Sequence, residues 1–380
     1  MREAADFLSR RARGVDASGI RKVFDLAAKM KDPINLSIGL PDFDVPPIAK
    51  TAAIEAIQNG QNRYTQTQGI APLRERLAKD LASEFGGRFS GHADDILITS
   101  GVSGGLLLAI LTLIDPGDQA IFLDPYFVMY KHLLAMAGGE PVIIDSYPDF
   151  RFRPEQVEKA ITPRTKLLIL NSPSNPTGIV MTEQEVRSAV ELARKHDLLI
   201  LSDEIYEPFF YAGIEFKNSR LPSPAREFDR TILLRGFSKS HAMTGWRVGY
   251  AAGPAEIISQ MAKLQQYTFV CAPSPFQAAA LAAMDVSMTD HIAAYRRKRD
   301  LVCELLSRKF EFARPEGAFY VFPKAPAGQT ASEFVTRAIE NNVLIIPGNV
   351  FSEGDTHFRI SYAVSDDRLR RGCEILCSLA

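Results

Sequence analysis

Short apolar runs alternate with amphipathic segments between about Asp94 and Glu256. The runs are rich in Ile, Leu and Val and end in polar, Gly or Pro residues, a pattern typical of buried strands bounded by turns. Because strands that alternate with helical segments usually form a parallel sheet, we expect an α/β fold with a mostly parallel seven-stranded sheet between helices. The expected strands are Ile96–Thr99, Ala120–Leu123, Val142–Asp145, Leu167–Leu170, Leu198–Asp203, Thr231–Leu234 and Val248–Ala251.

The pattern changes after Pro275. A long helical segment from Asp290 to Phe310 is followed by short apolar runs with helical segments between them, which predicts a second, smaller α/β domain. We therefore expect a large domain over residues 45–280 and a small C-terminal domain over residues 281–380. The short strands expected in the small domain are Ala318–Phe322, Val343–Ile346 and Phe358–Tyr362.

Composition narrows the class of protein. The 380 residues are 46% hydrophobic and 23% charged, as in ordinary globular proteins, and the formal net charge is -1. Since there is no basic excess to neutralise phosphates, we do not expect nucleic acid as a partner. No apolar run approaches the ~20 residues of a membrane span, and the N-terminus carries no apolar signal region. We expect a cytoplasmic protein without a membrane partner.

The cysteines and histidines do not suggest a metal site. Cys373 and Cys377 lie four apart on a predicted helix, but two ligands do not make a zinc site. Cys271 and Cys303 are isolated, and the six histidines are scattered along the chain. We expect free thiols and no bound metal.

The segment FSKSHAMTGWRVGY, Phe237 to Tyr250, carries the first candidate chemistry. Lys239 follows Ser238 directly, and Arg247 lies shortly beyond. A lysine amine can form a Schiff base with a carbonyl, while a hydroxyl and a guanidinium are typical phosphate ligands. A lysine between two phosphate ligands indicates pyridoxal phosphate, which is both an aldehyde and a phosphate ester. Taken alone, the segment is equally compatible with a solvated lysine.

Two further segments place polar side chains at the ends of predicted strands, where open α/β sheets bind ligands. NSPSNPTG, which begins at Asn171, offers the amide of Asn175, and LLILSDEIY delivers Asp203, Glu204 and Tyr206. An acid paired with a pyridine nitrogen keeps that nitrogen protonated, so the ring can accept electrons. We assign this role to Asp203, the first acid after the apolar run, and not to Glu204. The alternative for Asp203 is a helix cap or a turn residue.

Small residues fill the predicted strand-to-helix junction from Ser100 to Gly105. Such a junction lets backbone N–H groups approach a phosphate at a helix N-terminus. The junction matches neither G-x-G-x-x-G nor the Walker pattern, which disfavours a nucleotide-dependent dehydrogenase.

Together these segments closely resemble the class I aminotransferases of the fold-type I pyridoxal phosphate enzymes, and the aspartate, aromatic and broad-specificity branch is the most similar. The resemblance extends to INLSIGLPDFDVP (Ile34 to Pro46), RYTQTQGIAPLRERLA (Arg63 to Ala78) and HFRISYA (His357 to Ala363), so it covers nearly the whole chain. It implies a homodimer with shared active sites and an N-terminal segment, residues 1–44, that packs with the small domain.

The resemblance also implies roles for the reacting groups. Lys239 would bind the cofactor as a Schiff base and move the substrate proton, and Asp203 would pair with the pyridine nitrogen. Tyr206 and Asn175 would hydrogen-bond the phenolic oxygen. Arg359 would clamp the substrate α-carboxylate; without the resemblance, an arginine in such a strand would be read as a solvated surface residue.

The remaining matching residues would hold the cofactor or assist Arg359. Phe127 would stack on the cofactor ring, although a phenylalanine in this context is otherwise typical of a core. Gly39 and Asn175 would help Arg359 to bind the carboxylate. The residues expected around the phosphate are Gly101, Val102, Ser103, Ser238, Arg247 and, from the neighbouring subunit, Tyr64.

One position departs from the pattern of aspartate-selective members. Some of these carry a lysine two residues after the motif glycine, where this chain has Ser103. We therefore expect a broad range of amino donors (aromatic, neutral or aspartate) and a 2-oxo acid acceptor such as 2-oxoglutarate. Two alternatives stay open: a C–S β-lyase on the same fold, and a non-catalytic regulatory domain that binds a ligand.

Overall fold

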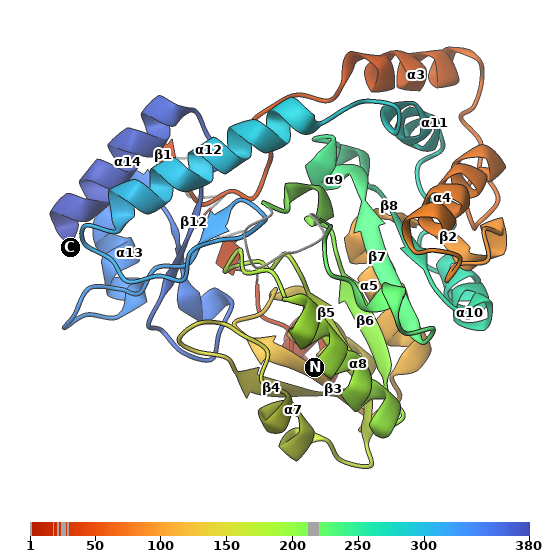
Figure 1. Ribbon diagram of the computed structural model, residues 1–380, viewed down its shortest axis with the longest axis horizontal. Coiled ribbons are helices and arrows are strands. Elements are labelled where there is room, and N and C mark those ends of the chain that lie inside the picture. Colours follow the sequence, from red (N-terminus) through yellow and green to blue (C-terminus); the bar gives the residue numbers. More distant parts are fainter. Residues whose placement is uncertain (1, 18, 21–22, 24–27, 29, 212–219) are drawn as a thin grey trace.

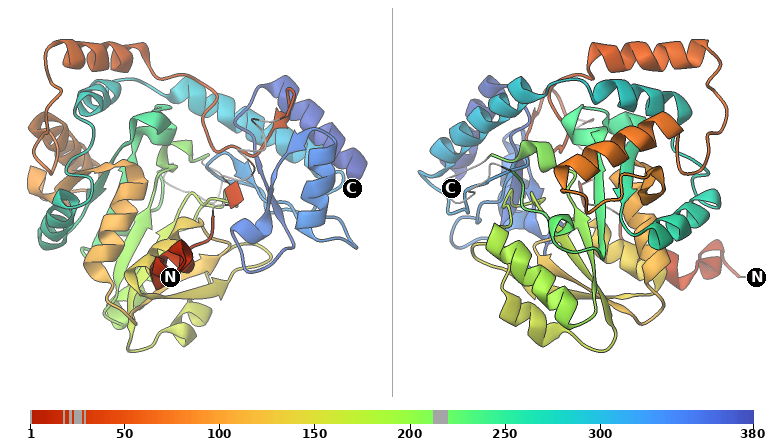
Figure 2. Two further views of the ribbon diagram at one scale, coloured as in Figure 1. Left: turned by 180° about the vertical axis from the view of Figure 1, so that it is seen from behind. Right: turned by 45° about the vertical axis from the view of Figure 1, so that its right-hand side comes forward.

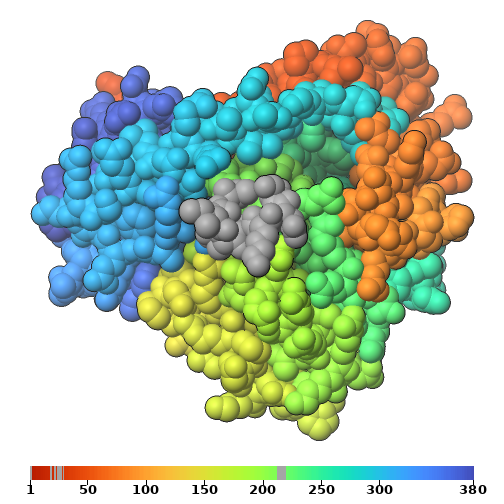
Figure 3. Space-filling model, viewed as in Figure 1, coloured from red at the N-terminus to blue at the C-terminus, as the bar shows by residue number. Residues whose placement is uncertain are grey.

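The computed structural model describes residues 2–17, 19–20, 23, 28, 30–211 and 220–380. A twisted central sheet carries helices on both faces, and a second group of helices and short strands lies beside it (Figure 1). In the space-filling view, the blue C-terminal residues lie on one side of the molecule and the orange to green residues of the sheet domain on the other (Figure 3). None of the described helices is long and apolar enough to cross a bilayer.

The described residues form a seven-stranded sheet in the order β2-β8-β7-β6-β5-β3-β4. β8 is antiparallel to β2 and to β7, and the other neighbouring pairs are parallel. Every predicted strand of this sheet is present, and the predicted ends differ by at most two residues. The strands are β2 (Ile96–Ser100), β3 (Gln119–Asp124), β4 (Glu140–Asp145), β5 (Thr165–Asn171), β6 (Leu199–Asp203), β7 (Thr231–Gly236) and β8 (Val248–Ala252).

Successive strand residues point to opposite faces, so the sheet has a core on each side. Leu167 and Ile169 of β5 pack with α5, α6 and α10, whereas Leu168 and Leu170 pack with α7 and α8. A further core lies between β2, β7 and β8 and helices α3, α4 and α11. These helices are α3 (Pro47–Gln58), α4 (Ala71–Glu84), α5 (Gly101–Leu113), α6 (Met129–Ala137), α7 (Pro154–Ala160), α8 (Glu183–Lys195), α10 (Ala255–Gln266) and α11 (Ser274–Ala283).

The second group of elements is built on short strands. β11, β12 and β9 form an antiparallel three-stranded sheet, and β1 pairs in parallel with β10. α12 runs from the sheet domain across to this group and ends at Leu306, earlier than predicted (Figure 1). The elements are β1 (Ile34–Asn35), α12 (Thr289–Leu306), β9 (Tyr320–Val321), α13 (Ala331–Glu340), β10 (Val343–Leu344), β11 (Ile346–Pro347), β12 (Phe358–Ser361) and α14 (Asp366–Leu379).

The prediction of one strand over Val343–Ile346 is wrong. The run is divided because its first half pairs with β1 and its second half pairs with β12. The pairing of β1 with β10 brings Ile34 beside Val343, so the N-terminal segment joins the C-terminal group at this point. The short helix α1 (Arg10–Arg13) projects from the sheet side of the molecule (Figure 2). Residues 21–22 and 24–27 of the same segment lie outside the described residues.

Candidate active site

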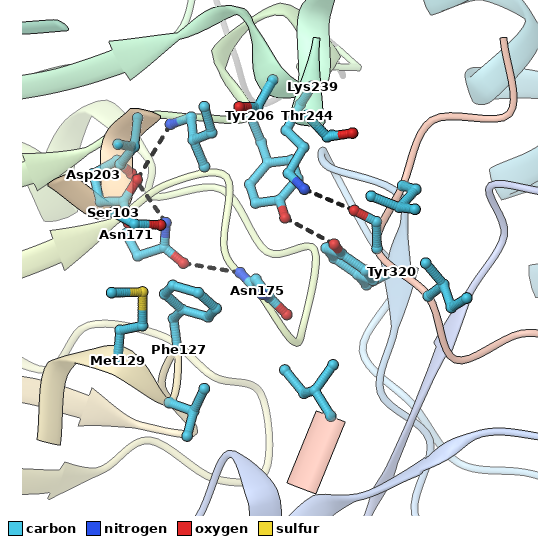
Figure 4. Close-up of a pocket in the computed structure, with 18 of the residues that line it drawn as sticks. Ser103, Phe127, Met129, Asn171, Asn175, Asp203, Tyr206, Lys239, Thr244 and Tyr320 are labelled. Atoms are coloured by element: carbon cyan, nitrogen blue, oxygen red, sulfur yellow. Dashed lines mark hydrogen bonds between the residues drawn. The ribbon is translucent and has the colours of Figure 1, made fainter. Parts of the chain in front are cut away.

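A pocket of about 650 Å³ lies where the carboxyl ends of β5, β6 and β7 meet β9 and β12. Segments far apart in sequence supply its wall, and their side chains point into one space (Figure 4). Eleven of the residues predicted from sequence line it: Gly39, Val102, Ser103, Phe127, Asn175, Asp203, Tyr206, Ser238, Lys239, Arg247 and Arg359.

The other two predicted residues lie outside the pocket wall. Tyr64 is 82% exposed and does not line the pocket of its own chain. Gly101 begins α5 with φ +66°, and a Cβ at this position would stand 2.6 Å from Nη2 of Arg247. Glycine is therefore required here, both for its left-handed backbone and because it lets the Arg247 guanidinium approach the start of the helix.

Lys239 follows β7 in the short helix α9 (Phe237–Ser240) and reaches into the pocket. Its Nζ donates a hydrogen bond to the carbonyl oxygen of Gly39 at 2.7 Å. Burial lowers the pKa of Lys239 to about 8, and the positive charges of Arg359 and Arg247 act in the same direction. At pH 7 about a tenth of this amine is therefore uncharged, far more than for a lysine with the ordinary pKa of 10.5, and the uncharged form is the one that attacks carbonyls and accepts protons.

Asp203 ends β6 and Glu204 follows it, and their side chains lie on opposite sides of the chain. Asp203 is 2% exposed and is the only carboxylate among the described residues of the pocket wall. Burial raises its pKa to about 6. Glu204 instead forms a buried ion pair with Arg235, with Nη2 2.8 Å from Oε2, and lines no part of the pocket.

Two arginines in the pocket wall have no carboxylate partner within the described chain. Arg359 is 1% exposed; it donates to Oδ1 of Asn175 at 2.9 Å and to the Ser37 carbonyl at 2.6 Å, and its Nε has no partner. Arg247 donates only to backbone carbonyls, at Thr244 and Ser100. Arg359 is buried and Arg247 is half-buried, and a guanidinium withdrawn from water without a counter-ion favours the binding of an anion, so each is a candidate anion site.

The two anion sites differ in their surroundings. Arg247 stands beside the N-terminus of α5, a thirteen-residue helix whose first N–H groups lack helical acceptors. A helix N-terminus and a guanidinium together suit a phosphate. Arg359 lies between the rings of Tyr320 and Phe351, 4.5 and 4.6 Å from their centroids. Its fork is held in one orientation, which suits a carboxylate. The alternative of a solvated surface arginine at position 359 is thereby excluded.

Residues 31–376 match the family described as aminotransferase class I and II. The chain belongs to this family. It is 38% identical to a probable aspartate aminotransferase of Methanocaldococcus jannaschii over 97% of this chain and 98% of the relative. It is 36% identical to aromatic-amino-acid aminotransferase 2 of Thermococcus litoralis over 97% and 96%. The solved structure of Thermus thermophilus aspartate aminotransferase with maleate superimposes with a TM-score of 0.92, at 35% identity and with both chains fully covered.

The family fixes the class of reaction. The chain is a transaminase with the fold-type I architecture, as the sequence motifs predicted. The alternatives of a non-catalytic regulatory domain and of a dehydrogenase are set aside by this membership.

Three described residues that were not predicted form side-chain hydrogen bonds with predicted site residues. Asn171 donates to the Asp203 carbonyl at 3.0 Å and accepts from the Asn175 N–H at 2.9 Å. The hydroxyls of Tyr320 and Tyr206 lie 2.8 Å apart, and the Tyr130 hydroxyl donates to Asp203 at 2.7 Å. Asn171 opens the NSPSNPTG motif, which is a usable signal. No sequence motif marks Tyr130 or Tyr320, because the residues that they contact lie far away along the chain.

Proposed function

We propose that this aminotransferase uses pyridoxal phosphate to move the amino group of an L-amino acid to a 2-oxo acid such as 2-oxoglutarate. One observation carries the proposal. Lys239 and two arginines without carboxylate partners face the same pocket, whose only described carboxylate is Asp203. A phosphate, an aldehyde and an α-carboxylate are the groups that this set of side chains would bind.

The residues of the pocket fit this cofactor. Arg247, Ser238 and the N–H groups of Val102 and Ser103 would hold its phosphate, and Phe127 would cover its ring. Asp203 would accept a hydrogen bond from the pyridine nitrogen and keep it protonated, while Asn175 and Tyr206 would bind the phenolic oxygen. When bound, pyridoxal phosphate supplies an electron sink for the carbanion formed at the substrate Cα.

Each chain residue then has a defined part in the reaction. Arg359 binds the substrate α-carboxylate and so fixes the position of Cα, with Asn175 and Gly39 at its side. Nζ of Lys239 would accept the proton from the substrate Cα and would return it at the second carbon of the 1,3-proton shift. Its lowered pKa suits this work, because a base with a pKa near the working pH both accepts and returns a proton.

The donor side chain faces an apolar surface. Among the described lining residues, the only cations are Lys239, Arg247 and Arg359, so the described part of the wall offers no further positive charge for a second carboxylate. Ser103 contributes a small neutral side chain. We propose a broad donor range in which aromatic and neutral amino acids are at least competitive with aspartate. The apolar side chains of the wall are Ile20, Ile38, Leu40, Val102, Leu106, Phe127, Val128, Met129 and Ile205.

Values of kcat/KM for phenylalanine, alanine and aspartate, each with 2-oxoglutarate, test the proposal. We expect all three to react, and aspartate to lead by less than about a hundredfold, or 2.7 kcal/mol. A larger preference would reveal a dicarboxylate clamp. With a cystathionine-like substrate, whose Cβ carries a thiol leaving group, and no oxo acid, sustained release of pyruvate and ammonia would identify a β-lyase and refute transamination as the main activity.

We also propose a homodimer with shared active sites. Tyr64 is 82% exposed, and the neighbouring helix α3 exposes the apolar side chains of Ile48, Ile54 and Ile57. An apolar exposed face of this kind favours burial against a second copy. Tyr64 would then reach the phosphate bound in the partner's pocket. For the single chain we propose three parts, residues 1–44, 45–280 and 281–380, a division with which the pairing of β1 with β10 is consistent.

A further inference from the structure

Tyr130 lies behind the pocket wall, in the first turn of α6, and is 2% exposed. Its hydroxyl donates to Oδ2 of Asp203 at 2.7 Å. Its ring stands edge-on to Phe127, with centroids 5.8 Å apart at 82°, and its N–H donates to the Phe127 carbonyl at 3.1 Å. One buried side chain therefore contacts both residues that would hold the cofactor ring.

We infer that Tyr130 is a positioning residue of this aminotransferase: its hydroxyl fixes the Asp203 carboxylate, and its ring fixes Phe127. The inference rests on the proposed function, since it concerns Asp203 and Phe127 as ligands of the pyridine ring. Tyr130 itself lines no part of the pocket, whereas Asp203 and Phe127, whose positions it fixes, both do.

The hydroxyl matters because Asp203 has few other partners. Within the part of the chain that the structure describes, the only other donor to its carboxylate is the backbone N–H of Ile205, at 3.3 Å from Oδ1. Three further titratable groups act on Asp203 through their charge or hydroxyl. The charge of Glu204, from the other side of the chain, opposes ionisation of Asp203, the charge of Lys239 favours it, and the Tyr206 hydroxyl also interacts with the carboxylate. The Tyr130 hydrogen bond lowers the pKa of Asp203 against the effect of burial, and burial raises the pKa of Tyr130 itself. Tyr130 therefore stays a proton donor, and Asp203 stays an acceptor.

Tyr126 provides a matched control four residues earlier. Its ring also packs on Phe122, at 5.0 Å against 5.8 Å for Tyr130, and it is 6% exposed. Its hydroxyl, however, donates to Glu353 at 2.7 Å and does not contact Asp203. Tyr126→Phe and Tyr130→Phe thus remove the same group from similar packing, and only the second removes a hydrogen bond to Asp203.

The experiment is a titration of cofactor-free protein with pyridoxal phosphate, and binding is followed by absorbance and fluorescence. It is repeated at pH values from about 5 to 8.5, because the pKa of Asp203 is raised to about 6. Without its Tyr130 hydrogen bond, Asp203 takes up a proton at higher pH. We expect the pH at which affinity falls on the acid side to rise by about one unit or more in Tyr130→Phe. Tyr126→Phe should follow the wild type.

The Asp203→Asn background separates a positioning role from general packing. In that background, Tyr130→Phe should cause no further shift, because the carboxylate on which the hydroxyl acts is absent. A Tyr130→Phe profile that superimposes on that of Tyr126→Phe, or an equal shift in the Asp203→Asn background, would overturn the inference. If the wild-type protein did not bind pyridoxal phosphate at all, the proposed function itself would be wrong.

Discussion

Replacement of Arg359 by lysine keeps the positive charge but removes the fork. In the wild type, Nη1 and Nη2 are oriented by Asn175 and the Ser37 carbonyl, so the guanidinium can present two parallel N–H groups to a carboxylate. Lysine offers one ammonium in their place. Loss of one charge-assisted hydrogen bond costs about 1.5–3 kcal/mol. This corresponds to a fall of about 10- to 150-fold in kcat/KM.

Since every amino acid donor carries the same α-carboxylate, Arg359→Lys should impair all donors by a similar factor. We expect the losses for phenylalanine, alanine and aspartate, each with 2-oxoglutarate, to agree within about threefold, or 0.6 kcal/mol. Arg164→Lys is the matched control, because Arg164 is half exposed and pairs with Glu140 away from the pocket. A loss for aspartate more than about tenfold greater than that for phenylalanine would show that Arg359 reads the side-chain carboxylate, against our assignment.

Three further changes test other parts of the site. Asp203→Asn should leave the protein folded and lower kcat by about a hundredfold or more. Glu204→Gln weakens the ion pair with Arg235, so it should lower Tm and leave kcat nearly unchanged. A large loss of kcat in Glu204→Gln with a mild effect of Asp203→Asn would show that Glu204 is the acid that pairs with the pyridine nitrogen. Tyr64→Phe should weaken cofactor binding by about 1.5–3 kcal/mol, measured as Kd, and a fully active monomer in sedimentation would exclude the shared site. Burial depresses the pKa of Lys239 from 10.5 to about 8, so between these pH values the unfolded chain binds more protons than the folded one. The unfolding free energy of cofactor-free wild type should therefore increase relative to that of Lys239→Met as the pH rises from about 8 to 10.5. A difference in unfolding free energy that stays constant over this range would contradict the burial of the amine.

The large sheet could be predicted from sequence because its strands are buried on both faces. Such strands are continuous apolar runs, and polar or Gly-rich turns end them, as at Leu167–Leu170 before Asn171. The division of Val343–Ile346 could not be predicted, because an apolar run does not identify the strand with which each half pairs. For the same reason, the pattern did not reveal that β8 runs antiparallel to its neighbours.

The candidate site was predictable to the extent that its residues lie in local motifs. Lys239 and Asp203 each stand in a short segment with its own chemistry, and both reach the pocket. Tyr130 and Tyr320 do not stand out in this way, because their roles depend on hydroxyl contacts with residues 73 and 114 positions away along the chain. Burial also changes the chemistry of the site: the lowered pKa of Lys239 arises from the packed pocket and from two arginines distant in sequence.

The most direct test of the account is to identify the lysine that carries the cofactor. Borohydride reduction of the purified enzyme with pyridoxal phosphate fixes the cofactor covalently to the amine that binds it, and peptide mass spectrometry then locates the label. We predict one labelled peptide per chain, with the label on Lys239, and no stoichiometric label in Lys239→Ala. A label on another lysine, or equal labelling of the wild type and Lys239→Ala, would contradict the assignment of Lys239 as the lysine that carries the cofactor.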